Sequence, residues 1–249
     1  MGKKPRIIAT AIIKCGTGKT TTAAALAQAA AADGKKVLAV DLDPQCNLTI
    51  ILGATQSQRG SLELLHNPGR SWELIQETPQ GISVIPASPD LAAEKTQKGS
   101  GRRLREGLAP LRSNYDLTII DTPPTLGELT FNALIAATDL LIPVEADKNS
   151  LQGLYQIVDV VQHLGESARD LSILGSVITR FDSRPKLNRY LYDAIKEHGE
   201  KNGVPLLMAI RPGVAIREAQ TLQRSIFEYA PNSKPAQDYR QLYKIIMEA

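Results

Sequence analysis

The sequence predicts an α/β fold in which a doubly wound, mostly parallel sheet carries helices on both faces. Two observations lead to this prediction: short β-branched apolar runs alternate with helical stretches from end to end, and most of these runs are apolar without interruption. Strands that are covered on both faces have such continuous runs, whereas strands with one solvated face alternate. Repeated β-α units with right-handed crossovers then wind into one sheet.

The apolar runs and the stretches between them define the predicted elements. Strands are expected at 6–12, 36–41, 82–87, 116–121, 140–145, 173–179 and 205–210. Helices are expected at 19–32, 90–112, 126–137, 150–165, 186–201, 214–222 and 235–248. The stretch 53–81 predicts loops with one or two short helices, and TQKGSGRR at 96–103 predicts a flexible basic interruption or a helix break.

The alanine-rich composition of the predicted helix at 19–32 indicates that it packs closely against the sheet. Eight of the ten residues from 23 to 32 are alanine, which favours a helix and lets it lie close against a sheet. Asp33 and Gly34 follow, and glycine just after a helix is a common stop signal.

Length and composition fit a single domain over residues 1–249. The chain is 43% hydrophobic, enough for a sizeable core, and no low-complexity linker or repeat divides it. Its net charge of +3 neither demands nor excludes a polyanionic partner. Two cysteines make no disulfide framework, and no apolar run approaches the roughly 20 residues that span a bilayer. We therefore expect a cytoplasmic protein.

Residues 11–28, AIIKCGTGKTTTAAALAQ, predict a phosphate-binding loop that leads from a strand into a helix. Glycines let backbone N–H groups approach phosphate oxygens, and the helix N-terminus adds positive potential. In such a loop Lys19 reaches the β- and γ-phosphates and the Thr20 hydroxyl binds Mg²⁺. The loop departs from G-x-x-x-x-G-K-[ST] because Ile13 stands where the first glycine belongs and Lys14 follows it.

Three carboxylates fall at the ends of predicted strands. Asp41 and Asp43 end the second strand, and Asp121 ends the fourth. Each alone could cap a turn, but the C-terminal ends of parallel strands are where ligands bind. Together with the GKT sequence they favour a magnesium–phosphate site.

The segment KCGTGKT at 14–20 resembles the deviant Walker A motif, KGGxGK[ST], of the ParA/MinD family of P-loop ATPases. The resemblance continues in order through DLDPQCNLT (41–49), IIDTPPTLGELTFNAL (119–134), LLIPVEADKNSLQGL (140–154), RPGVAIREAQ (211–220) and YAPNSKPAQDY (229–239). It covers nearly the whole chain and is strongest for the ParA-type, Soj-like subgroup without an extra N-terminal DNA-binding domain, since the first strand begins at residue 6.

The resemblance implies a slow, Mg²⁺-dependent ATPase and assigns a role to each motif residue. Lys14 would be the signature lysine, which crosses an ATP-bound dimer to the partner's phosphates and supplies the charge that phosphoryl transfer needs. Asp43 would orient the attacking water, while Asp41 would support the magnesium shell and Asp121 would hold Mg²⁺ through water. The nucleotide-binding set would be Lys14, Cys15, Gly16, Thr17, Gly18, Lys19, Thr20, Thr21 (at the α-phosphate), Arg211 and Pro212.

The resemblance also implies partners: a homodimer that forms on ATP binding, non-specific DNA, a ParB-like protein and association with the nucleoid. Binding through DNA phosphates needs a basic surface, and the candidates are Arg180, Arg184, Lys186, Arg189, Arg217 and Arg224. A membrane is the alternative partner, reached in MinD by a C-terminal amphipathic helix. Here the segment 236–249 has few basic residues, so it favours packing on the domain, and DNA is preferred.

Cys15 and Cys46 stand where the family pattern has glycine. A side chain at 15 would crowd the dimer dyad and would be strained if the loop needs positive φ there. The thiols are either tolerated substitutions, a redox pair or cross-dimer disulfide, ligands of a shared metal or iron–sulfur cluster, or an engineered crosslink. The corresponding alternative functions are a nucleotide-binding switch with little hydrolysis because of Cys15, and a redox- or metal-containing relative.

Overall fold

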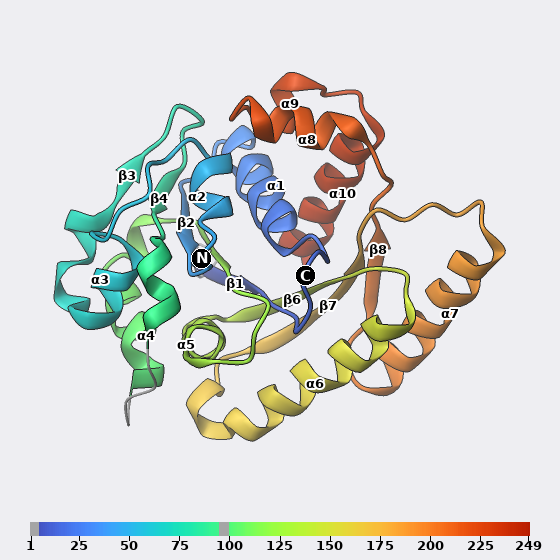
Figure 1. Cartoon of the computed structure of the whole chain (residues 1–249), viewed down its shortest axis with the longest axis horizontal. Coiled ribbons are helices and arrows are strands. Elements are labelled where there is room, and N and C mark those ends of the chain that lie inside the picture. Colours follow the sequence, from blue (N-terminus) through green and yellow to red (C-terminus); the bar gives the residue numbers. More distant parts are fainter. Residues whose placement is uncertain (1–4, 95–99) are drawn as a thin grey trace.

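A computed structural model describes residues 5–94 and 100–249, and in these residues the chain winds around one eight-stranded sheet (Figure 1). The strand order is β3-β4-β2-β5-β1-β6-β7-β8, and every neighbouring pair is parallel except β3 and β4. The strands are β1 (Arg6–Thr10), β2 (Val37–Asp41), β3 (Gln76–Glu77), β4 (Ser83–Ile85), β5 (Leu117–Asp121), β6 (Asp139–Val144), β7 (Ser172–Ile178) and β8 (Leu206–Ala209). The predicted α/β class is confirmed.

Helices cover both faces of this sheet (Figure 1). The α-helices are α1 (Lys19–Ala32), α2 (Asn47–Ile51), α3 (Ser61–His66), α4 (Arg103–Leu108), α5 (Glu128–Ala136), α6 (Lys148–Leu164), α7 (Lys186–Lys201), α8 (Val214–Thr221), α9 (Ile226–Tyr229) and α10 (Lys234–Glu248). Short 3₁₀ turns are η1 (Pro68–Leu74), η2 (Pro89–Ala93), η3 (Ser100–Arg102), η4 (Arg112–Asn114) and η5 (Gly165–Ala168). None of the helices in the described ranges is both long and apolar enough to cross a membrane.

The alanine-rich helix α1 is the centre of one layer. It packs against β5 and α10, and its residues from Thr22 to Ala30 are all buried. The helix ends as predicted, because Gly34 adopts a φ of 74° and its N–H donates to the carbonyl of Ala31 at 2.9 Å. The small side chains therefore let α1 lie between the sheet and α8–α10.

The register of the central strands brings their C-terminal ends together. Thr10 of β1 and Asp41 of β2 both pair with Asp121 of β5. The loop that follows β1 starts from this same edge and leads into α1. Chain segments far apart in sequence thus deliver polar side chains to one place.

Helix 90–112 was the largest error of the sequence-based assignment. The α-helical part is only Arg103–Leu108, preceded by the turns η2 and η3. The turn η2 ends at Glu94, whose ψ of 120° is extended rather than helical, so the chain leaves the helical conformation before Arg103. Pro110 then disfavours further helix. Of the interruption predicted at 96–103, residues 96–99 lie outside the described ranges. The short elements β3, α2 and α9 were not predicted, since none has a long periodic pattern.

Candidate functional site

The loop between β1 and α1 has the backbone of a phosphate-binding turn. Gly16 and Gly18 have φ values of 79° and 82°, a region that favours glycine. A Cβ on Gly18 would also lie 3.2 Å from Thr179 Cγ2. Gly18 precedes the first turn of α1, and its carbonyl accepts from Thr22 N at 2.8 Å. Both conformation and packing therefore require glycine at 18.

Lys19 turns back into the loop that precedes it. Its side chain is buried and Nζ donates to the carbonyl of Lys14 at 2.8 Å. Burial lowers the pKa of Lys19, while the nearby carboxylates of Asp121 and Asp43 act in the opposite direction. The ammonium group thus lies against the phosphate-binding loop, where it can bind an anion held by that loop.

Asp121 has the chemistry of a metal ligand. It is fully buried, and its Oδ1 accepts from Thr10 Oγ1 at 3.3 Å. Its Oδ2 is buried and has no hydrogen-bond partner among residues 5–94 and 100–249, and burial raises the pKa of Asp121 to about 8 against the lowering effect of the nearby Thr20 hydroxyl. Mg²⁺ binds carboxylate and hydroxyl oxygens. The unpaired oxygen beside Thr20 and the phosphate loop therefore fits a magnesium site.

Asp41 uses both of its oxygens to hold the chain that follows β2. Oδ1 accepts from Asp43 N at 3.0 Å, and Oδ2 accepts from Thr49 N at 2.9 Å and Thr49 Oγ1 at 2.8 Å. Burial raises the pKa of Asp41 to about 6. Asp43, nearly buried, is thereby fixed on the wall of the cavity described next. Thr49 was missed because nothing in its local sequence indicates a partner eight residues earlier.

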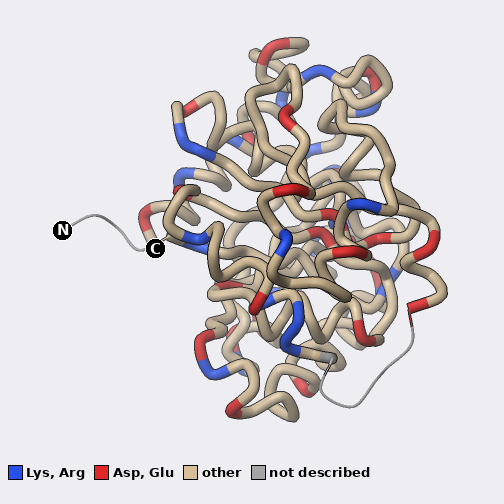
Figure 2. Tube along the Cα trace, turned by 90° about the vertical axis from the view of Figure 1, so that its left-hand side faces the viewer, with Lys and Arg blue, Asp and Glu red and all other residues tan. Residues whose placement is uncertain are grey.

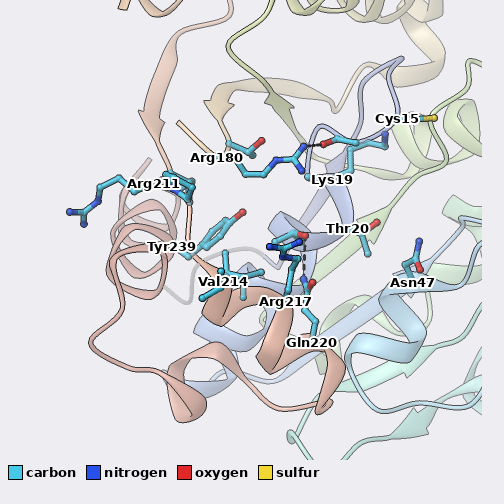
Figure 3. A pocket seen from close by; sticks show the side chains of 18 of the residues that line it. Cys15, Lys19, Thr20, Asn47, Arg180, Arg211, Val214, Arg217, Gln220 and Tyr239 are labelled. Carbon is cyan, nitrogen blue, oxygen red and sulfur yellow. Dashed lines mark hydrogen bonds between the residues drawn. The ribbon is translucent and has the colours of Figure 1, made fainter. Parts of the chain in front are cut away.

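A cavity of about 770 Å³ lies against the phosphate loop (Figure 3). This is a size typical of small-molecule sites. Of the predicted residues it is lined by Cys15, Gly16, Gly18, Lys19, Thr20, Thr21, Asp43, Arg211 and Pro212. Its far wall, which sequence reasoning did not identify, is lined by Ile210, Val214, Ile216, Gln220 and Tyr239. One end of the cavity therefore carries amides and cations that suit phosphate groups, and the other end is largely apolar and suits a base.

Arg211 holds the far wall instead of reaching into the cavity. Its backbone N–H donates to Asp238 Oδ2 at 2.8 Å and its guanidinium to Asp238 Oδ1 at 2.7 Å. Figure 3 shows the Arg211 side chain directed away from the cavity. The pair ties the segment after β8 to α10. Asp238 was not predicted because it lies 27 residues away from its partner.

Lys14 is paired within its own chain. Its Nζ donates to Asp147 Oδ2 and lies 3.9 Å from Glu145 Oε2, at the end of β6. Asp147 also caps α6 by accepting from Asn149 N at 2.8 Å. Partial burial raises the pKa of Asp147, but the hydrogen bond and charge of Lys14 outweigh it and the net shift is downward. Lys14 does not line the cavity in this form of the chain.

The six candidate DNA-binding residues do not lie together. Arg180 and Arg217 line the cavity, and Arg224 lies over the ring of Tyr229 at 6.0 Å. Arg184, Lys186 and Arg189 are exposed at the start of α7. Figure 2 shows basic and acidic residues interspersed over the face turned to the viewer. Of the basic set, the exposed residues that are close in sequence are therefore Arg184, Lys186 and Arg189.

The two cysteines differ in a way that the sequence did not indicate. Cys15 is exposed and is not among the non-glycine residues with positive φ, so the strain expected there is absent. Cys46 is fully buried with a φ of 56°, and Sγ donates to the carbonyl of Pro44 at 3.3 Å. Burial raises the pKa of the Cys46 thiol to about 11. Both thiols are free, and no cluster of three or more potential metal ligands occurs among residues 5–94 and 100–249.

Cys46→Gly should be more stable than Cys46→Ala by about 1 kcal/mol, because alanine keeps the left-handed strain that glycine relieves. Glycine also loses the buried thiol, so we expect it to lie within about 1 kcal/mol of the parent protein. Urea unfolding of the three proteins measures the order. An alanine variant as stable as the glycine variant would contradict the strain at this position.

Comparison with known proteins adds a family to this geometry. A family model described as an AAA domain matches residues 5–173. The chromosome-partitioning ATPase Soj of Thermus thermophilus is 37% identical over 248 residues, 98% of this chain and 96% of that protein. The sporulation initiation inhibitor protein Soj of Bacillus subtilis is 34% identical over 98% of each chain.

Solved structures agree with the sequence matches. A putative plasmid partition protein from Borrelia burgdorferi bound to AMPPNP has a TM-score of 0.84 and 25% identity, covering 98% of this chain and 99% of that one. Cobyrinic acid a,c-diamide synthase from Mycobacterium smegmatis with bound ADP and magnesium has a TM-score of 0.82 and 29% identity, covering 98% and 94%.

Proposed function

Because this chain belongs to the ParA/MinD family of partitioning ATPases, we propose that it is an ATP-dependent dimerising switch that moves DNA or another cargo. As a member of that family it is an ATPase. The observation that carries the proposal is the buried, unpaired Oδ2 of Asp121 at the edge where the phosphate loop, Lys19 and Thr20 meet. We propose that the whole chain acts as one domain, since both halves of the sheet contribute to the cavity wall.

In this proposal the phosphate loop and Lys19 bind the β- and γ-phosphates of ATP. Thr20 and Asp121 would hold Mg²⁺, which supplies positive charge against the charge that develops on the transferred phosphate. Asp41 fixes the backbone of Asp43, and Asp43 would orient the attacking water. The apolar end near Val214 and Tyr239 would take the base, and Thr21 the α-phosphate side.

We further propose that ATP binding pairs two copies and that the dimer binds DNA without sequence preference. The exposed basic residues Arg184, Lys186 and Arg189 are the best placed to contact DNA phosphates. A ParB-like partner would accelerate hydrolysis and release the DNA. These steps are supported by the family and by the exposed start of α7. With them we propose that the protein acts on the nucleoid in the cytoplasm.

The test is ATP hydrolysis and DNA binding by the purified full chain. We expect turnover that requires magnesium, and DNA binding that requires ATP and falls steeply between 50 and 200 mM salt, by about 10³-fold or more for several phosphate contacts. Absence of turnover that is restored by Cys15→Gly would favour the alternative, a nucleotide-binding switch in which the exposed Cys15 blocks hydrolysis.

The double variant Lys186→Gln, Arg189→Gln should weaken DNA binding of the ATP-bound protein and leave ADP affinity unchanged. Both side chains are exposed and neither lines the cavity. Each lost phosphate contact lowers the slope of log affinity against log salt by about 1. An unchanged slope in a fluorescence-anisotropy titration would exclude this helix start as the DNA surface.

A further inference from the structure

We infer that Thr179 and Arg180, the two residues after β7, are positioning residues that aim the amide groups of the phosphate loop at the nucleotide. The inference rests on the proposed nucleotide site and assigns it two residues outside the phosphate-loop motif. It also gives Arg180 a different role from DNA contact. Both side chains donate hydrogen bonds to the backbone of the loop.

Side chains hold three carbonyl groups of the loop. Thr179 Oγ1 donates to the carbonyl of Thr17 at 2.8 Å, and the Arg180 guanidinium donates to the carbonyl of Gly16. Lys19 Nζ holds the carbonyl of Lys14 at 2.8 Å. Figure 3 shows Arg180 reaching to the loop from the opposite wall of the cavity.

Fixing a carbonyl fixes the amide that follows it. In a trans peptide the C=O of one residue and the N–H of the next point in opposite directions. Holding the carbonyls of Gly16 and Thr17 therefore turns the N–H groups of Thr17 and Gly18 away from the two side chains. Within the described residues, no amide from Cys15 to Gly18 donates to a protein acceptor. These free, aligned N–H groups form the concave anion site that phosphates occupy.

The backbone conformation of Arg180 supports a positioning role for its side chain. Its φ is 51°, a left-handed value that costs a non-glycine residue about 1 kcal/mol. Hydrogen bonds on both sides maintain it, from Thr179 N to Val144 O and from Phe181 N to Ile210 O, each 2.8 Å. Glu145 accepts a further bond from the guanidinium and orients it. Strained residues held in this way cluster at functional sites.

Thr179 is fixed by shape as well as by its hydroxyl. It is buried, and its methyl group fills the space beside Gly18, 3.2 Å from where a Cβ of that residue would lie. Thr179→Val keeps this methyl contact and removes only the hydroxyl, while Thr179→Ser keeps the hydroxyl. The pair therefore separates hydrogen bonding to Thr17 from packing against Gly18.

The experiment is calorimetric binding of ADP and of AMP to the full chain, with magnesium. Only ADP carries the β-phosphate that the loop amides cradle. We expect ADP to bind about fivefold more weakly to Thr179→Val and about tenfold more weakly to Arg180→Gln, with AMP changed by less than about twofold. Thr179→Ser should bind ADP nearly as the parent protein does.

Arg59→Gln is the matched control, because it removes one positive charge from an exposed arginine that does not line the cavity. Its ADP affinity should not change. Unchanged ADP affinity in Thr179→Val and Arg180→Gln, or an equal loss for ADP and AMP, would overturn the inference. So would weaker DNA binding of Arg180→Gln at normal ADP affinity. If the parent protein binds no ADP, that result contradicts the proposed function itself and not only the role of Thr179 and Arg180. Melting temperatures of the variants show whether each one is folded.

Discussion

Lys14→Ala is expected to hydrolyse ATP at least about 100-fold more slowly than the parent protein, because a cation supplied across an interface is worth 10³ or more in phosphoryl transfer. ADP binding should change little, since Lys14 lies against Asp147 and does not line the cavity. Steady-state hydrolysis and ADP calorimetry measure the two effects separately. Equal losses in both would place Lys14 inside its own nucleotide site.

Mixing two inactive variants tests whether Lys14 acts in the partner's site. In a heterodimer of Lys14→Ala and Asp43→Ala, one of the two sites has its own Asp43 and receives Lys14 from the other subunit. Random pairing of equal amounts in a two-fold dimer then restores about a quarter of the parent rate. No recovery would show that Lys14 acts within its own chain.

Asp147→Asn is the control for the contact that Lys14 makes here. Asparagine keeps the N-cap of α6, because its side-chain oxygen still accepts from Asn149 N, but it loses the charge that holds Lys14. We expect hydrolysis to be retained or raised, since Lys14 is easier to release. A loss as large as that of Lys14→Ala would show that the Lys14–Asp147 pair itself is needed for turnover.

Asp121→Asn should have opposite effects on stability and on magnesium use. In metal-free protein the folded carboxyl keeps its proton up to a pKa of about 8, whereas the unfolded one loses it near 3.8. The folded state binds more protons in that interval, so stability falls as pH rises from about 4 to about 8. Asparagine removes this penalty, and we expect about 2 kcal/mol of added stability at pH 8 in EDTA.

The same substitution should remove the magnesium dependence of ATP affinity, since asparagine offers a neutral oxygen in place of the carboxylate. Urea unfolding at several pH values, with EDTA and with magnesium, measures both consequences. Asp238→Asn is a matched control, because Asp238 is also buried but is paired with Arg211. Loss of the Asp238 charge leaves Arg211 without its ion-pair partner, so this substitution should lower the free energy of unfolding. An Asp121→Asn protein that is less stable than the parent in EDTA would contradict the unpaired state of Oδ2.

Much of the fold could be predicted because its determinants are local. The continuous apolar runs located seven of the eight described strands, and the alanine-rich stretch after Gly18 located α1 at 19–32 with its stop at Gly34. The helix at 186–201 was also predicted with its observed bounds. The prediction of one helix over 90–112 was wrong because the backbone becomes extended at Glu94 and is α-helical only over Arg103–Leu108.

The site was predictable where a motif lies within one loop or at one strand end. Lys19, Thr20 and Asp43 come together at the cavity because strand ends of a parallel sheet share an edge. Their roles remain predictions that the variants above test.

The sequence by itself determined the α/β class, the phosphate loop and the edge of the sheet where its carboxylates gather, since each depends on residues that are neighbours in the chain. Only the tertiary structure decided how side chains pair across that edge. Lys14 meets Asp147 over 133 residues and Arg180 meets Gly16 over 164. Such pairs depend on β6 lying between β1 and β7 in the sheet, which brings the start of α6 and the end of β7 close to the loop after β1. No local sequence pattern indicates that arrangement. The strain at Cys46 rather than Cys15 likewise depends on the turn that α2 makes against β2.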